Sequence, residues 1–338
     1  MKPLIITMGD PTGVGPEIIV KALLEGAFDA VDGPLLVAGD RAVLQQAAAI
    51  FTDDVVAKED RLLIEGRSLA VNNLTSLPAD TLEYGRPDRA CGEAMATYID
   101  WAARQCLAGT AAGMVTAPIN KKAINAAGID FPGHTELLAD LCGIDKVVMM
   151  LAGERLRVCL VTTHLALSEV PSALSVEEIT ETIRITADSL QRQFGIKAPR
   201  LAVLSLNPHA GEDGLFGNEE TCLIGPAIEQ AQVLGIAASG PHSADTLFHF
   251  AVTGNYDAVI CMYHDQGLIP LKLLHFEDGV NVTLGLPIVR TSVDHGTAYD
   301  LAGSGKASCA SLVAAIRVAE EMAGKQKAED RSRRQKTE

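Results

Sequence analysis

Three apolar, strand-like runs of this chain each end in a histidine: His164, His209 and His264. In an open α/β sheet, the carboxyl ends of the strands face the crevice where ligands bind. Three imidazoles delivered to that edge from separate strands suit a divalent metal ion that keeps one coordination position open for a substrate. The histidines are too far apart in the sequence for a local zinc knuckle, so the pattern indicates a catalytic metal site.

Polar residues flank two of these histidines. Asn207 and Glu212 lie beside the second histidine, and Asp265 and Gln266 follow the third. Side chains of this kind orient metal-bound imidazoles by bonding to the second ring nitrogen. The flanking residues therefore favour one shared ion over three unrelated core histidines.

Residues 131–136, Phe-Pro-Gly-His-Thr-Glu, combine a Pro-Gly turn with the start of a helix. Exposed amides at a helix amino terminus form a natural anion site, to which Thr135 and His134 could add donors. A simple helix cap beside a surface histidine is the alternative, and these residues alone favour the cap.

Arg290 ends a run that is too apolar for an ordinary surface arginine, and Lys272 and Asn281 precede it. A buried cation needs an anionic partner, either a protein carboxylate or the phosphate of a substrate, and the residues leave that choice open. The polar, glycine-rich segment that follows, residues 294–306, is either a flexible connection or a nucleotide-binding loop.

The segment Gly9–Glu17, with the sequence GDPTGVGPE, follows the first expected strand and opens a helix. Its glycine spacing does not match a dinucleotide-binding fingerprint, and it lacks the Gly-Lys-Ser/Thr of a P-loop. The glycines allow a tight strand-to-helix turn, and Pro16 suits the first turn of a helix. A structural turn and a loop that lines a ligand site both stay open.

The elements that must position these residues alternate along the chain as apolar strand, glycine-rich turn and amphipathic helix. Strands are expected at 3–8, 34–39 and 113–117, and helices at 17–24, 93–107, 177–194 and 308–322. This alternation predicts an α/β fold, with a mostly parallel sheet covered by helices on both faces. The less regular stretch 53–87 indicates an antiparallel excursion.

Composition narrows the class of protein. The 338 residues carry a formal net charge of −15, which argues against nucleic acid as a partner because phosphate backbones need a basic face. Seven cysteines without a CxxC pair indicate reduced thiols and a cytoplasmic location. Neither a signal peptide nor a membrane span is expected. Residues 324–338 are charged, lack apolar anchors and are expected to form a disordered tail.

Six motifs in a fixed order resemble the 4-hydroxythreonine-4-phosphate dehydrogenase family over residues 3–323. They are Gly9–Glu17, TAPINK at 116–121, FPGHTE at 131–136, NPHAGE at 207–212, YHDQG at 263–267 and RTSVDHGTA at 290–298. The resemblance implies a fold like that of isocitrate and isopropylmalate dehydrogenases. Residues 1–323 would then form a single catalytic unit of two interleaved α/β lobes around a largely parallel sheet, with the active site in the cleft. It also implies NAD or NADP as cofactor, bound without a Rossmann fingerprint.

The resemblance assigns roles to individual residues. It implies one divalent ion (zinc, magnesium, manganese or cobalt) on His164, His209 and His264. The implied substrate-binding residues are His134, Thr135, Lys272, Asn281 and Arg290, and the implied cofactor-binding residues are His295, Gly296, Thr297 and Ala298. Asp245, Asp265 and Lys272 are the candidate catalytic residues. Tyr299 stands where isocitrate-type enzymes commonly carry a proline.

The implied reaction is the oxidation of 4-phosphohydroxy-L-threonine to 2-amino-3-oxo-4-phosphooxybutanoate, which decarboxylates to 3-amino-2-oxopropyl phosphate for pyridoxal 5'-phosphate biosynthesis. The metal would lower the pKa of the substrate alcohol, and a base would take its proton as hydride leaves for the nicotinamide. The alternative is a D-threonate or D-erythronate 4-phosphate dehydrogenase of sugar-acid catabolism, since both would share the metal and phosphate contacts. The expected partners are the small phosphorylated substrate and a second copy of the chain, in a homodimer that shares its active sites.

Overall fold

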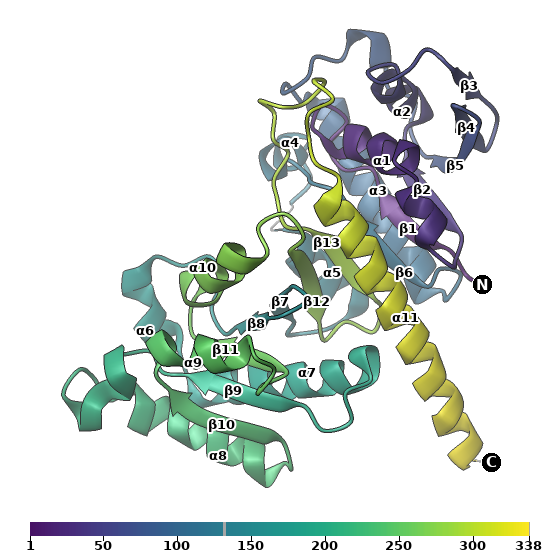
Figure 1. The fold of residues 1–338 in the computed structure, drawn as a ribbon. Coiled ribbons are helices and arrows are strands. Elements are labelled where there is room, and N and C mark those ends of the chain that lie inside the picture. Colours follow the sequence, from purple (N-terminus) through teal and green to yellow (C-terminus); the bar gives the residue numbers. More distant parts are fainter. Residues whose placement is uncertain (131–132, 338) are drawn as a thin grey trace. The chain divides into compact units, whose positions relative to one another are not determined.

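The chain forms two compact units, and the computed structural model describes residues 1–130 and 133–337, with side chains through Ala328. Unit 1 comprises Met1–Asp145 and Leu286–Ala323, and unit 2 comprises Lys146–Gly285 together with the segment from Gly324. The chain therefore leaves unit 1, builds unit 2 and returns. The colour sequence in Figure 1 follows this path.

Unit 1 is built on a largely parallel sheet. Its strands are β1 (Leu4–Thr7), β2 (Leu35–Gly39), β3 (Val55–Ala57), β4 (Arg61–Ile64), β5 (Arg67–Asn73), β6 (Gly113–Thr116) and β13 (Arg290–Val293). In the order β13-β6-β1-β2-β5, neighbouring strands run parallel. Every residue of β1 and β6 is buried, as a central strand covered on both faces requires. The carboxyl ends of β13, β6 and β1 therefore meet at one edge of the sheet.

Beyond β5 the direction of the strands changes. Strand β4 pairs antiparallel with β5, and β3 pairs antiparallel with β4. Glu65 and Gly66 join β4 to β5 with positive φ angles of 50° and 75°, which matches a tight two-residue hairpin turn. The antiparallel excursion expected within residues 53–87 is confirmed.

The helices of unit 1 are α1 (Gly15–Leu24), α2 (Arg41–Ala48), α3 (Arg89–Leu107), α4 (Lys121–Ala126), α5 (His134–Cys142) and the first part of α11 (Ala310–Thr337). Short 3₁₀ turns lie at Ala27–Ala30 and Ala79–Thr81. Helix α3 packs against β1, β2 and β6 through an apolar face that includes Met95, Ile99 and Cys106. Helix α2 begins where the Asp40 carboxylate accepts hydrogen bonds from the first free amides, a standard amino-terminal cap.

Unit 2 carries a mixed sheet. Its strands are β7 (Val148–Ala152), β8 (Arg157–Leu160), β9 (Arg200–Leu204), β10 (Ala237–His242), β11 (Ala258–Cys261) and β12 (Val280–Leu284). In the order β10-β9-β11-β8, neighbouring strands run parallel. Strand β7 then pairs antiparallel with both β8 and β12. The strands that precede the three histidines are therefore adjacent and point the same way.

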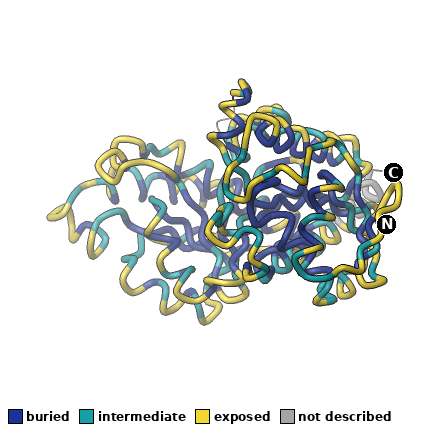
Figure 2. Tube along the Cα trace, turned by 90° about the horizontal axis from the view of Figure 1, so that it is seen from above, coloured by how far each residue is buried: buried dark blue, intermediate teal, exposed yellow. Residues whose placement is uncertain are grey.

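Helices cover both faces of this sheet, as the sequence predicts. The α-helices are α6 (Val170–Ala173), α7 (Val176–Phe194), α8 (Gly225–Val233), α9 (Ala244–Ala251) and α10 (His264–Leu274), with 3₁₀ turns at Leu167–Glu169 and Pro208–Gly214 and a π-helical turn at Glu220–Ile224. Leu247 of α9 and Leu268 of α10 pack in one core with Val158 of β8. Helix α7 lies over the opposite face, where its Thr186 contacts Cys159. Figure 2 shows buried stretches of the chain in the interior and exposed stretches mainly at the periphery.

The remaining elements match the sequence pattern closely, with one difference at the carboxyl end. Helix α11 begins at Ala310 and continues to Thr337, so it extends past Gly324 into the segment for which a disordered tail is expected. Lys, Glu, Gln, Arg and Ala are good helix formers, and neither glycine nor proline follows Gly324. None of the helices in the described part of the chain is long and apolar enough to cross a membrane.

Candidate active site

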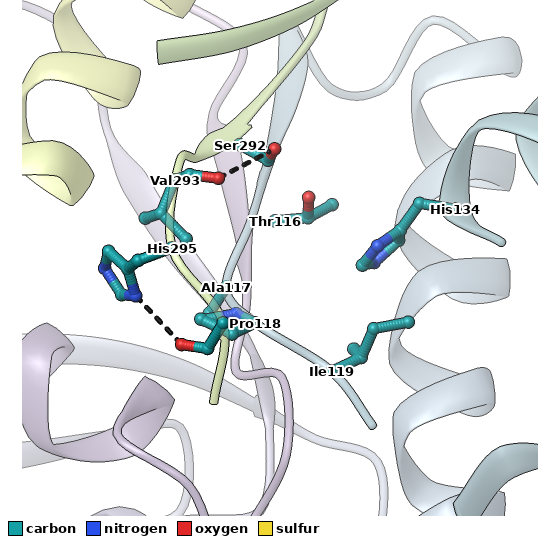
Figure 3. Close-up of a pocket in the computed structure, with 9 residues that line it drawn as sticks. Thr116, Ala117, Pro118, Ile119, His134, Ser292, Val293 and His295 are labelled. Atoms are coloured by element: carbon teal, nitrogen blue, oxygen red, sulfur yellow. Dashed lines mark hydrogen bonds between the residues drawn. The ribbon is translucent and has the colours of Figure 1, made fainter. Parts of the chain in front are cut away.

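A cavity of about 190 Å³ lies at the carboxyl edge of the unit 1 sheet. It is lined by residues from β6 and the segment after it, from the start of α5, and from β13 and the segment after it: Thr116, Ala117, Pro118, Ile119, His134, Ser292, Val293, His295 and Gly296. Figure 3 shows His134 and His295 on opposite sides of it, with Thr116 between them. The fold therefore brings one expected substrate residue and two expected cofactor residues to the same cavity.

A buried arginine stands beside this cavity. Arg290 is only 2% exposed, and its Nη2 donates to Thr116 Oγ1 at 2.8 Å. Burial lowers the pKa of Arg290 to about 10, and the nearby Glu136 carboxylate acts in the opposite direction. The guanidinium is still cationic at neutral pH, so this edge of unit 1 carries a fixed positive charge.

His134 is kept neutral by the same surroundings. Burial, and then the positive charge of Arg290, hold the pKa of His134 well below its ordinary value. A neutral imidazole offers one donor and one acceptor nitrogen, so His134 can bond to a substrate without adding charge. The cation and the neutral imidazole together suit an anionic, hydrogen-bonding ligand.

The expected helix start at this site is confirmed, although Phe131 and Pro132 lie outside the described residues. Helix α5 begins at His134, with Gly133 in the cap position and no side-chain cap bond. Thr135 therefore lies in the first turn and is not the cap itself. The first-turn amides keep the orientation that suits an anion.

The expected cofactor residues form a loop whose backbone is held by the Gly9–Glu17 segment. Val14 donates its backbone N–H to the Thr297 carbonyl at 3.1 Å, and the His295 Nδ1 bonds to the Gly296 carbonyl at 3.0 Å. Ala298 adopts a φ of 42°, a left-handed conformation that residues other than glycine rarely take. This loop is therefore held in a specific, unfavourable backbone shape by its neighbours.

The sequence analysis did not identify three residues of this region as members of the site. Thr116 and Ser292 line the cavity, and Asp10 is buried beneath it with hydrogen bonds to its neighbours. The signal for Thr116 was available, because it ends a strand at the carboxyl edge of a parallel sheet. Nothing in the local sequence marks Asp10 as buried.

The three expected metal ligands belong to unit 2, and two of them lie together. His164 follows β8, and His264 is the first residue of α10 after β11. Their ring centroids are 5.6 Å apart. Two imidazoles on one tetrahedral ion, with metal–nitrogen bonds of about 2 Å, have centroids roughly 5 Å apart, so this spacing fits a shared ion. His264 Nδ1 also lies 2.7 Å from Asp265 Oδ1, which leaves Nε2 for a metal.

His209 is not gathered with the other two. Its segment, residues 209–213, has five consecutive positive φ angles between 44° and 81°. His209 is exposed and lies near Asp245 of α9, where its charge contributes to lowering the pKa of that carboxyl. In the part of the chain that the structure describes, no group of three or more His, Cys, Asp or Glu side chains is arranged to hold a metal ion. The fold therefore brings His164 and His264 together and leaves His209 apart from them at the same sheet edge.

A buried carboxylate anchors the base of the His209 segment. Glu220 is 4% exposed, and its Oε1 accepts hydrogen bonds from the amides of Leu206 and Asn207 at 2.9 and 2.8 Å. The Asn207 side chain also donates to Glu220 Oε2 at 3.0 Å. Asn207 was expected to support the metal site, whereas Glu220, on the π-helical turn, was not anticipated.

The other candidate residues of unit 2 are spread along its elements. Asp245 lies at the start of α9, where the Ser243 hydroxyl donates to it at 2.5 Å and lowers the pKa of its carboxyl. Asp265 is exposed, and Lys272 lies on the same helix, α10, with its ammonium 5.7 Å from the centre of the Phe276 ring. Asn281 lies in β12 with a buried Oδ1 that has no partner among the described residues. An unpartnered buried oxygen of this kind is an open position for a ligand's donor group.

Comparison with known proteins shows to which family the chain belongs. The family model described as "Pyridoxal phosphate biosynthetic protein PdxA" matches residues 31–319. A 4-hydroxythreonine-4-phosphate dehydrogenase from Geobacter metallireducens is 57% identical over 324 residues, 95% of each chain, and one from Trichlorobacter lovleyi is 52% identical over 330 residues, 95% of this chain and 98% of the relative. The crystal structure of a 4-hydroxythreonine-4-phosphate dehydrogenase from Klebsiella pneumoniae superimposes with a TM-score of 0.85 at 40% identity, over 95% of this chain and 98% of that one. The expected α/β fold is thereby confirmed, and the chain belongs to the PdxA family.

Proposed function

We propose that this chain is an NAD(P)-dependent 4-hydroxythreonine-4-phosphate dehydrogenase of pyridoxal 5'-phosphate biosynthesis. The observation that carries the proposal is the unit 1 cavity, where the neutral His134 faces the His295–Gly296 segment and the buried cation Arg290 lies alongside. The phosphate of a phosphorylated substrate would be attracted to this cation. The names of the relatives support the same substrate.

Each group of the substrate has a counterpart among the described residues. Arg290 and the Thr116 hydroxyl suit a phosphate or carboxylate, since an arginine bonds such groups at two positions. The unpartnered Asn281 Oδ1 suits a donor such as a hydroxyl or ammonium group. An unmade hydrogen bond at a buried oxygen is unfavourable by about 1–3 kcal/mol, so a substrate that bonds to it gains that amount.

We propose that His164, His209 and His264 bind one divalent cation, which supplies Lewis acidity at the substrate alcohol. The centroid spacing of His164 and His264 supports the pair, and the Asp265 contact supports the orientation of His264. The left-handed backbone of residues 209–213 supports a movement of His209 on metal binding, because L-residues leave that conformation with a gain of about 1 kcal/mol each.

The chemistry requires a base for the alcohol proton and an acceptor for the hydride. A nicotinamide held by the His295–Ala298 loop would accept the hydride from the carbon that carries the hydroxyl, and a carboxylate or Lys272 would take the O–H proton. Asp245 and Asp265 are the candidate carboxylates, and the Ser243 bond keeps Asp245 ionised at neutral pH. The product is a β-keto acid, which loses carbon dioxide to give 3-amino-2-oxopropyl phosphate.

A homodimer that shares its active sites is part of this proposal. Ile269, Leu273 and Phe276 are 67%, 85% and 77% exposed at helical spacing along and just beyond α10. Contiguous exposed apolar side chains mark an interaction surface. Because α10 also carries His264 and Lys272, a second copy seated there would reach the candidate site.

The proposed location is the cytoplasm. All seven cysteines are free, and burial raises the pKa of several of their thiols, including Cys159 to about 12. Inert, reduced thiols of this kind suit a reducing compartment.

The test follows nicotinamide reduction with 4-phosphohydroxy-L-threonine, D-threonate 4-phosphate and D-erythronate 4-phosphate. Each substrate is assayed with NAD and with NADP, before and after treatment with a chelator and after metal is restored. Turnover of the amino acid phosphate that the chelator abolishes and metal restores is the expected result. Turnover of only the sugar-acid phosphates would overturn the substrate assignment, and chelator-insensitive turnover would overturn the metal assignment.

A further inference from the structure

A partly buried hydrogen-bond network, with the fully buried Asp10 as one member, contacts the loop that carries the expected cofactor residues. The Tyr299 hydroxyl donates to Asp10 Oδ2 at 2.6 Å and accepts from the Asn120 side-chain amide at 2.5 Å. Asp10 is fully buried, and its other oxygen accepts from the Thr12 amide and hydroxyl at 2.8 and 2.9 Å. The phenol therefore joins two segments that are remote from it in the sequence.

These bonds connect three motifs of the chain. Asp10 belongs to Gly9–Glu17, Asn120 caps α4 directly after the cavity-lining segment of β6, and Tyr299 follows the His295–Ala298 segment. The same loop is held further along, where the Gly303 amide donates to Glu17 Oε2 at 2.8 Å. The Gly9–Glu17 segment thus contacts the loop over its length.

The energetics argue that this network has a purpose beyond filling space. Burial raises the pKa of Asp10, and burial together with the Asp10 bond raises the pKa of Tyr299 to about 12, so the phenol stays protonated and donates. A buried polar group is unfavourable unless its bonds are made, whereas an apolar pair would fill the same space without that requirement. Fully satisfied polar networks fix one geometry, and here the fixed geometry includes the left-handed Ala298 next to Tyr299.

We propose that Asp10 and Tyr299 are positioning residues that hold the His295–Ala298 loop in the conformation that binds the dinucleotide. The proposal rests on the proposed function, because it takes this loop as the cofactor site. It gives the Gly9–Glu17 segment a role as the support of a binding loop.

The test compares Tyr299→Phe with the matched control Tyr84→Phe. Both changes remove one phenol oxygen beside the same loop, since the Tyr84 ring packs against Gly303, but the Tyr84 hydroxyl has no hydrogen bond among the described residues. The Kd values of NAD and NADP are measured by calorimetry, and kcat and both KM values are measured with the amino acid phosphate. The variant Asp10→Asn and the double variant complete a thermodynamic cycle.

Tyr299→Phe is expected to raise the cofactor Kd and KM about tenfold, the usual effect of losing a hydrogen bond to a charged group. The kcat at saturating cofactor and the substrate KM are expected to stay within twofold, as are all parameters of Tyr84→Phe. The cofactor Kd of the double variant is expected to be no higher than that of the weaker-binding single variant, because both changes break the same bond.

Three outcomes separate the hypotheses. Equal cofactor binding by Tyr299→Phe and Tyr84→Phe would overturn the positioning role and leave the proposed function intact. A parallel loss of kcat and substrate binding in Tyr299→Phe would show a general structural role instead. Failure of the unmodified protein to bind either dinucleotide would overturn the proposed function itself, and the positioning role with it.

Discussion

The proposed cofactor site of unit 1 and the proposed metal site of unit 2 differ in how far the folded chain has already assembled them. In unit 1, Arg290 and Asp10 are buried, hydrogen-bonded and fixed beside a formed cavity. In unit 2, His164 and His209 are exposed, and only His164 and His264 lie close enough to share an ion. Both sets lie at the carboxyl ends of parallel strands, so the difference does not come from the sheet.

The difference comes from what satisfies each group. Buried charges and hydroxyls must find partners within the protein, so folding itself fixes Arg290, Thr116 and Asp10. Exposed imidazoles are satisfied by water and need no protein partner. Their gathering depends on the free energy of binding an ion, which couples metal binding to local structure. Unit 1 is therefore expected to bind its ligand with a formed site, and unit 2 to complete its site on binding.

The largest effect is expected from His264→Ala. Loss of a ligand from the two-histidine pair removes the Lewis acid, so turnover is expected to fall about a thousandfold while the Kd of NAD(P) changes less than twofold. Calorimetric titration with Zn²⁺ and steady-state kinetics measure the two quantities. His249→Ala, an exposed histidine on α9, is the control. Equal Zn²⁺ binding by both variants would remove His264 from the metal site.

Arg290→Ala tests the unit 1 site, which the folded chain has already formed. Loss of the buried cation is expected to raise the KM of the phosphate-bearing substrate about a hundredfold, the upper range for a bond between charged groups. Arg290→Lys keeps the charge without the paired geometry, so its substrate KM is expected to lie between those of the unmodified protein and Arg290→Ala. Arg104→Ala, an exposed arginine of α3, controls for the change in net charge. An unchanged substrate KM in both Arg290 variants would exclude this residue from the site.

Glu220→Gln tests whether the support of the His209 segment contributes to metal binding in unit 2. The amide keeps one acceptor oxygen but loses the charge that holds the Leu206 and Asn207 amides, so the His209 segment is expected to bind metal about tenfold more weakly. The Kd of Zn²⁺ is measured against Glu229→Gln, an exposed residue of α8. The Kd of NAD(P) is expected to stay constant in both variants. Identical Zn²⁺ affinities would show that Glu220 supports the fold and not the metal site.

The smallest effect concerns stability and pH. The pKa of His134 is lowered in the folded protein, so the unfolded chain binds more protons below its ordinary pKa of about 6.5. The free energy of unfolding is therefore expected to fall as pH decreases below 6.5, by at most about 1.4 kcal/mol per pH unit from this residue. Thermal unfolding from pH 5 to 8 measures this loss of stability. The stability of His134→Gln is expected to decline less steeply with decreasing pH than that of His249→Gln. Parallel curves for the two variants would contradict a lowered pKa of His134.

Much of the fold follows from local pattern. The apolar runs and helical spacing predicted α3, α7 and the first strands to within a few residues, and the irregular stretch 53–87 became the β3–β5 meander. The charged segment after Gly324 gives no single prediction, because its low hydrophobicity favours disorder and its residues favour a helix. The site was harder to predict from the sequence, because the Asp10–Tyr299 hydrogen bond joins residues at opposite ends of the chain.

The sequence by itself determined which residue types stand at the ends of which strands. Strand order and direction then follow physical rules, so His164, His209 and His264 were bound to reach one sheet edge. Only the tertiary structure decided which side chains are buried there. It made Arg290 a fixed cation and His134 neutral, placed the Gly9–Glu17 segment against the His295–Ala298 loop, and left His209 apart from the other two histidines. The reason is physical: hydrogen bonding and desolvation depend on neighbours in space, and local sequence specifies only neighbours along the chain.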